Sequence, residues 1–330
     1  MDRMEQKVEG LRQFTSPYAP EICLLGARLK HDSRRTSPDP IFVFGKGHKL
    51  TQALNSLCGE AAERDALYLR STDRVRPIMN VDLAVLKQVA AEKVLLSGVP
   101  EDLGSTGCAA HNTFDTAARL AIAELIERHA ALLWWQGDLR PIELGSAWTG
   151  RTEIDHYISN LRSGCLIARQ TTFYCLGAFG PLRVAVARSE GEDGSEIAIA
   201  FAADDTLSGA VKRATLELAS VELEVADLCY ARRTNAPIPL DSNRGLVARR
   251  QEALAGPYAH LFDASKGPVP ADSPKSLSLA ALGRQLSVDG LAVHIADLSR
   301  NDTKLPTCRA LFEEPDRQPR LPRGPELSPF

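Results

Sequence analysis

Two segments of the chain carry the same short pattern of charged residues, Glu-x-x-Glu-Arg. The pattern is formed by Glu60, Glu63 and Arg64 in the first segment and by Glu124, Glu127 and Arg128 in the second. At 3.6 residues per turn, positions i, i+3 and i+4 lie on one face of an α-helix. Each pattern therefore places two carboxylates and one guanidinium on a single stripe, a set of side chains that can hold a metal cation.

The helices that must position these groups are apolar on nearly every side. The apolar spacing predicts one helix over residues 50–69 and a second over 115–135, with Asn112 or Asp115 as the N-terminal cap of the second. A stripe of ordinary ion pairs facing solvent is the alternative, but helices that are apolar all round are buried. Buried carboxylates are costly unless they are paired or bind a cation. Four carboxylates and two arginines leave surplus negative charge, which indicates Mg²⁺ shared with phosphate oxygens, and hence a nucleotide site.

A third helix, predicted over residues 208–230, adds further polar groups at helical spacing. Its shared side carries Arg213, Glu217, Ser220 and Glu224, whereas Glu222 points away. For this helix alone, a charged stripe facing solvent is an equally good interpretation. The chain has no Gly-x-x-x-x-Gly-Lys-Ser/Thr loop, which excludes a P-loop. If ATP binds here, helix carboxylates acting through Mg²⁺ and a few basic groups must hold it.

Composition narrows the class of protein. The 330 residues include 39 basic and 42 acidic side chains, and 44% are hydrophobic, which is typical of a globular protein and excludes a fibrous or disordered chain. Without a basic excess we expect no nucleic-acid partner. The first residues lack a signal-peptide core, and no apolar run reaches the ~20 residues of a membrane span. We therefore expect a cytoplasmic protein without a membrane partner, with its seven scattered cysteines reduced.

The remaining patterns predict an α/β (α+β) protein. Residues 41–44 predict a short buried strand that ends in a turn at Gly45-Lys46-Gly47, and residues 182–188 and 196–202 predict a β-hairpin. Three segments follow from these patterns. We expect a loose N-terminal lead over residues 1–40, one ATP-binding catalytic domain over 41–300, and an extended proline-rich tail over 301–330.

These motifs resemble, in consistent order over residues 40–230, those of the YcaO family. Gly45-Lys46-Gly47 and the later Ser56-x-x-x-Glu60-x-x-Glu63-Arg64 are similar to the family's GKG and SxxxExxER signatures. Residues 105–112 and 124–135 resemble its NGxAAG and ELxERDAxxxWW stretches, and residues 210–217 resemble its AxxRAxxE helix. The resemblance implies a β-sheet flanked by long buried helices that carry the ExxER motifs.

The same resemblance implies a Mg-ATP-dependent enzyme that acts on ribosomally made peptides. Family members phosphorylate a backbone amide oxygen after a nucleophile has attacked the amide carbon. In a cyclodehydratase the nucleophile is a Cys, Ser or Thr side chain of the peptide, and the product is a thiazoline or oxazoline. By motif correspondence the Mg²⁺ ligands are Glu60, Glu63, Glu124, Glu127 and Glu217. The ATP-binding residues implied in the same way are Lys46, Ser56, Arg64, Arg128, Arg213 and Ser220.

Departures from the family pattern leave two alternatives open. Ser220 stands where the family often has Gln, and the tail lacks the alternating prolines of the azoline-forming members. One alternative is thioamide formation from external sulfide with a TfuA-type partner. The other is a catalytically degenerate scaffold subunit that binds no nucleotide. A Cys108–His111 nucleophile and base is a third, independent interpretation of the residues.

Partners follow from the resemblance as well. A cyclodehydratase of this family works on a precursor peptide with a separate subunit that resembles ubiquitin-activating enzymes and recognises the leader peptide. A flavin dehydrogenase is a further partner in such systems, and a homodimer is compatible with them. Too little chain precedes residue 40 for a fused leader-binding domain, so we expect a separate partner subunit.

Overall fold

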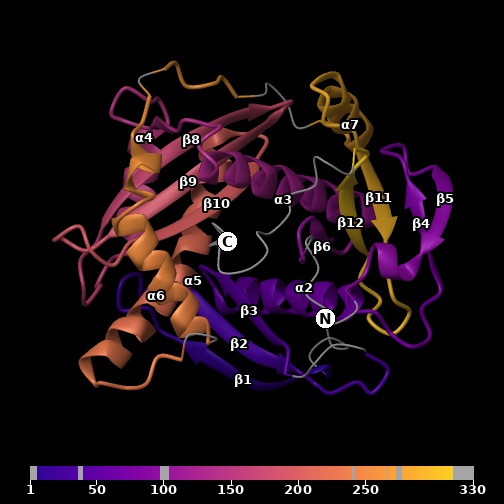
Figure 1. Cartoon of the computed structure of the whole chain (residues 1–330), viewed down its shortest axis with the longest axis horizontal. Coiled ribbons are helices and arrows are strands. Elements are labelled where there is room, and N and C mark those ends of the chain that lie inside the picture. The colour runs from indigo at the N-terminus through magenta and orange to yellow at the C-terminus, as the bar shows by residue number, and fades with distance from the viewer. Residues whose placement is uncertain are drawn as a thin grey trace.

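The computed structural model describes residues 6–35, 40–96, 104–239, 242–265, 267–272 and 277–314. Within these ranges, helices and antiparallel sheets are arranged around a central helix, α3 (Figure 1). The helices are α2 (Leu50–Leu67), α3 (Phe114–Trp135), α4 (Arg151–Leu161), α5 (Leu207–Arg233), α6 (Asn243–Ala255) and α7 (Leu279–Val288), with short 3-10 turns at Ala91–Lys93 and Ala259–Phe262. No helix in these ranges has both the length and the apolar character needed to span a bilayer.

The strands form three antiparallel sheets. The first has the order β1 (Val8–Phe14), β2 (Cys23–Leu29) and β3 (Phe42–Gly47). The second has the order β10 (Ala198–Asp204), β9 (Leu182–Glu190), β8 (Gln170–Phe179) and β7 (Ile142–Glu143). The third has the order β5 (Val85–Ala90), β4 (Val75–Met79), β11 (Val293–Asp297), β12 (Thr307–Phe312) and β6 (Cys108–Ala110).

Helices cover both faces of the four-stranded sheet, which explains its apolar strands. Along β9, Val184 and Val186 pack into the core that contains α3, whereas Ala185 and Ala187 pack into the core that contains α5. Because successive strand residues point to opposite faces, a strand buried on both faces is apolar at every position. The α3 core continues to β11 and β12 of the five-stranded sheet, so one buried helix joins two sheets. The predicted fold class is confirmed.

Several local predictions differ from the structure. Thr113, rather than Asn112 or Asp115, caps α3, because its hydroxyl accepts a hydrogen bond from the Thr116 N–H. Gly45-Lys46-Gly47 is the end of strand β3 and is no turn. A Cβ on Gly45 would lie 2.2 Å from the Ala53 carbonyl oxygen of α2, so these glycines allow a strand and a helix to approach closely.

Strands also occur where the sequence indicated only a lead and a tail. β1 and β2 lie within residues 1–40, and β12 lies within residues 301–330, between β11 and β6. The proline-rich residues 315–330 lie outside the described residues. These strands carry weak local signals because their pairing partners are distant in sequence, as in the register Thr307↔Ala110.

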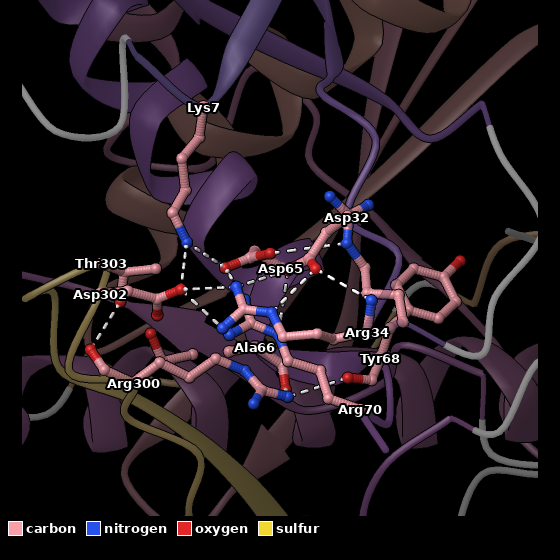
Figure 2. Close-up of polar contacts among 12 residues, drawn as sticks. Lys7, Asp32, Arg34, Asp65, Ala66, Tyr68, Arg70, Arg300, Asp302 and Thr303 are labelled. Atoms are coloured by element: carbon pink, nitrogen blue, oxygen red, sulfur yellow. Dashed lines mark hydrogen bonds and ion pairs between the residues drawn. The ribbon is translucent and has the colours of Figure 1, made fainter. Parts of the chain in front are cut away.

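A charge cluster with Asp65 and Arg70 buried at its centre connects the N-terminal sheet to the end of α2 (Figure 2). It consists of Lys7, Asp32, Arg34, Asp65, Arg70 and Asp302. The Lys7 ammonium donates to Asp65 at 2.8 Å and to Asp302 at 2.9 Å. The Arg70 guanidinium donates to the same two carboxylates at 2.7 and 3.0 Å. The cluster therefore holds the C-terminal end of α2, the helix that carries the first ExxER motif.

We expect Asp65→Asn to destabilise the protein by about 3 kcal/mol, because it removes the buried carboxylate that Lys7 and Arg70 share and leaves them only more exposed carboxylates, chiefly Asp302. The Asp65 side chain is only 2% exposed, and it faces both Lys7 and Arg70. Glu9→Gln is the matched control, because Glu9 also pairs with an arginine, Arg28, but at an exposed position. Urea unfolding of both variants measures the difference. A loss below 1 kcal/mol for Asp65→Asn would show that the cluster is not structural.

Candidate active site

A cavity of about 610 Å³ lies between α2, α3 and α5, with contributions from β3 and α6. Ten of the eleven residues that the motifs single out line it: Lys46, Ser56, Glu60, Glu63, Arg64, Glu124, Glu127, Arg128, Arg213 and Glu217. They come from four elements that are far apart in sequence. The structure therefore brings the two ExxER stripes and the third helix together around one cavity.

Ser220 is the exception, because it lies on α5 outside the cavity lining, where its neighbour Val221 takes part instead. Glu222 points away from the cavity, as its spacing predicts, and it is buried against Arg162 and Ser189 at 2.7 and 2.6 Å. The motifs also miss Arg250 on α6, which lines the cavity. No spacing signal marks Arg250, because α6 is brought to the site by tertiary packing, which includes its contacts with α5.

Strand β3 delivers Lys46 to the cavity. Gly47 lies as close to α2 as Gly45 does, since a Cβ on it would come within 2.5 Å of the Gln52 side chain. Lys46 lies between the two glycines, and its ammonium group donates a hydrogen bond to the Glu217 carboxylate of α5. On the same strand, the Phe44 N–H donates to Glu60 Oε2 at 3.2 Å. The strand therefore positions one carboxylate from each of two helices.

Each arginine of the ExxER motifs is paired within its own stripe. Arg64 lies 3.6 Å from Glu60, and Arg128 lies 3.8 Å from Glu124 and 3.6 Å from Glu127. Glu63 instead accepts a hydrogen bond from the Ala110 N–H at 3.0 Å. The arginines orient three of the four stripe carboxylates, and the fourth is held by backbone.

Partial burial raises the pKa values of the carboxylates on α2 and α3 that line the cavity. Burial, and next the charge of Glu124, raise the pKa of Glu63 well above its usual value. Burial likewise raises the pKa of Glu127 to about 7, despite the attraction of Arg128. The pKa values of Glu60 and Glu124 are raised for the same main reason. The described lining holds five carboxylates and five cationic side chains, so the raised pKa values come from burial and from carboxylates that lie near one another on α2 and α3, and no net surplus of negative charge is needed to explain them.

Magnesium fits this set of residues. Mg²⁺ prefers oxygen ligands, and it commonly uses one or two protein carboxylates together with water and phosphate oxygens. Among the described residues, no three His, Cys, Asp or Glu side chains already meet closely enough to enclose a metal ion. The carboxylates instead line the walls of a cavity that is large enough for a phosphate-bearing ligand. This arrangement favours a metal that is bound together with phosphate.

The structure argues against Cys108 as a nucleophile. Cys108 and His111 both line the cavity, but burial and the neighbouring Glu63 raise the pKa of the Cys108 thiol well above its usual value. Catalytic cysteines need the thiolate and therefore a lowered pKa. Cys108 is 3% exposed on β6 and packs with Leu67 and Ala296, as a small apolar residue would.

Comparison with known proteins identifies the family of the chain. The model of one family, described as YcaO cyclodehydratase, ATP- and Mg²⁺-binding, matches residues 102–313, which is more than half of the chain. No curated protein matches the chain by sequence.

Solved structures show the same fold. YcaO from Methanopyrus kandleri, solved with AMPPCP and Mg²⁺, is 18% identical with a TM-score of 0.70, over 98% of this chain and 93% of that one. A heterocyclase in complex with substrate and cofactor is 16% identical with a TM-score of 0.67, over 94% of this chain and 51% of its own. A chain of the E. coli microcin synthetase McbBCD complex with pro-MccB17 bound is 12% identical with a TM-score of 0.61, over 92% and 87%. The chain belongs to the YcaO family, and the ATP and Mg²⁺ that its motifs implied are the ligands by which that family is described.

Proposed function

We propose that this protein is a Mg-ATP-dependent cyclodehydratase, which activates backbone amides of a ribosomally made peptide by O-phosphorylation and forms thiazoline or oxazoline rings. The observation that carries the proposal is the convergence of ten motif residues on one cavity. The membership of the YcaO family, with its ATP- and Mg²⁺-binding description, supports it.

The residues divide into carboxylates on one side and basic or hydroxyl side chains on the other. Glu60, Glu63, Glu124, Glu127 and Glu217 are the proposed Mg²⁺ ligands. Lys46, Ser56, Arg64, Arg128 and Arg213 are the proposed contacts to the nucleotide or to those carboxylates. Bound Mg²⁺ would neutralise the charge of the transferring phosphoryl group, and positioning and charge neutralisation are the main contributions that phosphoryl transfer requires of a protein. The ion pairs of Arg64 and Arg128 keep the carboxylates in place before any ligand arrives.

A peptide substrate and a partner subunit are part of the proposal. The fold is shared with a heterocyclase solved with its substrate and with a subunit of the McbBCD complex, and these likenesses support both expectations. The nucleophile decides the product, because a peptide Cys, Ser or Thr leads to an azoline and external sulfide leads to a thioamide. Turnover with a cysteine-containing peptide, with and without sulfide, separates these two products by mass.

Calorimetric titration of AMPPCP with Mg²⁺ into the protein tests the proposed nucleotide site. We expect saturable binding by the wild type and at least a tenfold loss in Glu124→Gln/Glu127→Gln, because two proposed metal ligands lose their charge. The loss should be smaller when Mg²⁺ is omitted for both proteins. Absence of binding by the wild type, even with a partner subunit, would instead support the degenerate scaffold.

A further inference from the structure

One of the cationic side chains that line the cavity has no ion pair with a carboxylate of the described residues, whereas the others do. Four of them have a carboxylate partner: Lys46 with Glu217, Arg64 with Glu60, Arg128 with Glu124 and Glu127, and Arg213 with Asp204. Arg250 has no ion pair and no hydrogen bond to any residue in the described ranges, and its Nε is buried without a hydrogen-bond partner. Arg250 is therefore a cation whose donors are left for something else.

The surroundings of Arg250 increase the cost of leaving it unpaired. Burial lowers the pKa of Arg250; the charge of Glu224 opposes this shift, and the smaller influence of the like charge of Arg128 adds to it. Glu224 is itself hydrogen-bonded to the Asn243 side chain. Arg250 and Arg128 line the same cavity, and two like charges that share a partly buried cavity repel each other unless an anion binds between them.

We propose that Arg250 and Arg128 together clamp a phosphate group of the nucleotide; this inference rests on the proposed function. The carboxylates of α2 and α3 are suited to the metal, and they repel a phosphate that lacks one. The two guanidiniums supply the complementary charge from α3 and α6. A guanidinium has five N–H donors in a planar fork and binds phosphate through two parallel hydrogen bonds, which a single ammonium cannot do.

Titration of AMPPCP with Mg²⁺ into Arg250→Gln tests the clamp. We expect the affinity to fall about 10- to 100-fold, the usual loss for a hydrogen bond to a charged group. Arg250→Lys should recover only part of the affinity, because it restores the charge without the fork. Arg249→Gln is the matched control, since it removes the same charge from the same helix at a position outside the cavity lining, and it should bind as the wild type does.

Two further measurements make the result decisive. Without ligand, the melting temperature of Arg250→Gln should equal or exceed that of the wild type, because a buried and poorly paired cation is removed. A lower melting temperature would show that a loss of affinity in this variant comes from damage to the fold. Titrations of ADP and of inorganic phosphate into the same variants then assign the phosphate: a loss for AMPPCP alone points to the terminal group, and an equal loss for ADP points to an inner one.

Failure of this inference is distinct from failure of the proposed function. If the wild type binds AMPPCP and Arg250→Gln binds it within twofold of the wild type, the clamp is wrong while the nucleotide site stands. If the wild type binds no nucleotide, the proposed function fails and the clamp fails with it.

Discussion

Glu63→Gln is expected to lower ATP turnover on the order of 100-fold, a size typical of losing one charge-stabilising group at a phosphoryl-transfer site. The same variant should melt at a higher temperature than the wild type in the absence of ligand. Glu63 is partly buried in the cavity lining, and its pKa is raised first by burial and then by the charge of Glu124. Glutamine keeps an oxygen to accept the Ala110 N–H, so the substitution removes the charge and retains the hydrogen bond.

The combination of lower activity and higher stability is diagnostic. A carboxylate kept for structure alone would stabilise the protein, whereas a proposed metal ligand costs stability until the metal binds. Thermal melting without ligand and ATPase turnover with peptide and partner measure the two effects. A Glu63→Gln variant that turns over ATP at the wild-type rate would remove Glu63 from the proposed Mg²⁺ ligands.

Glu222 provides the control with the opposite signature. Like Glu63, it is a glutamate in the interior of the protein, but it lies outside the cavity lining. Arg162 donates a hydrogen bond to it at 2.7 Å and Ser189 donates another at 2.6 Å. We expect Glu222→Gln to cost about 3 kcal/mol, because Arg162 and the buried Arg169, which lies 3.3 Å from Glu222, both lose the charge of this carboxylate. Its affinity for AMPPCP should remain that of the wild type. Equal behaviour of the two variants would show that the charge of Glu63 has no special role.

The ligand-free protein should lose stability as the pH rises from about 5 to about 8. Burial raises the pKa of Glu127 to about 7, so between its ordinary value of 4.5 and about 7 the folded state holds a proton that the unfolded state has released. The free energy of unfolding therefore falls through this range, by about 3 kcal/mol for Glu127 alone. Glu60, Glu63 and Glu124 have raised pKa values and act in the same direction.

Metal and nucleotide should reduce this loss. Mg²⁺ binds the ionised carboxylates, so its binding should release protons and strengthen as the pH rises. Urea unfolding at several pH values, with and without AMPPCP and Mg²⁺, measures the effect. Glu127→Gln should flatten the ligand-free profile. A wild-type stability that rises from pH 5 to pH 8 would show that these carboxylates are ionised already without a metal.

Sequence periodicity predicted the elements that depend on local signals. The three long helices are confirmed, because apolar residues at helical spacing over 18 or more residues are a local signal. The β9–β10 hairpin is confirmed by its register, in which Ala198 pairs with Ser189. Strand β12 was missed, because it is recognisable only by pairing with β11 and β6, which come from distant parts of the chain.

For the candidate site, the sequence by itself determined which side chains share a helix face. Helical spacing put Glu60 with Glu63, and Glu124 with Glu127, since that relation depends on 3.6 residues per turn and on nothing else. It also indicated burial, because an apolar helix must be covered by other elements. The sequence could not show whether the separate stripes face the same cavity.

Only the tertiary structure determined that the stripes of α2, α3 and α5 line the same cavity. It also determined which residues depart from the prediction made by helical spacing. Ser220 shares a helix with Glu217, yet the packing of α5 leaves it outside the cavity lining. Arg250 has no motif around it, yet α6 brings it into the lining beside Arg128. The physical reason is that helix periodicity fixes directions around one axis, whereas the distances between axes are set by which apolar surfaces bury one another.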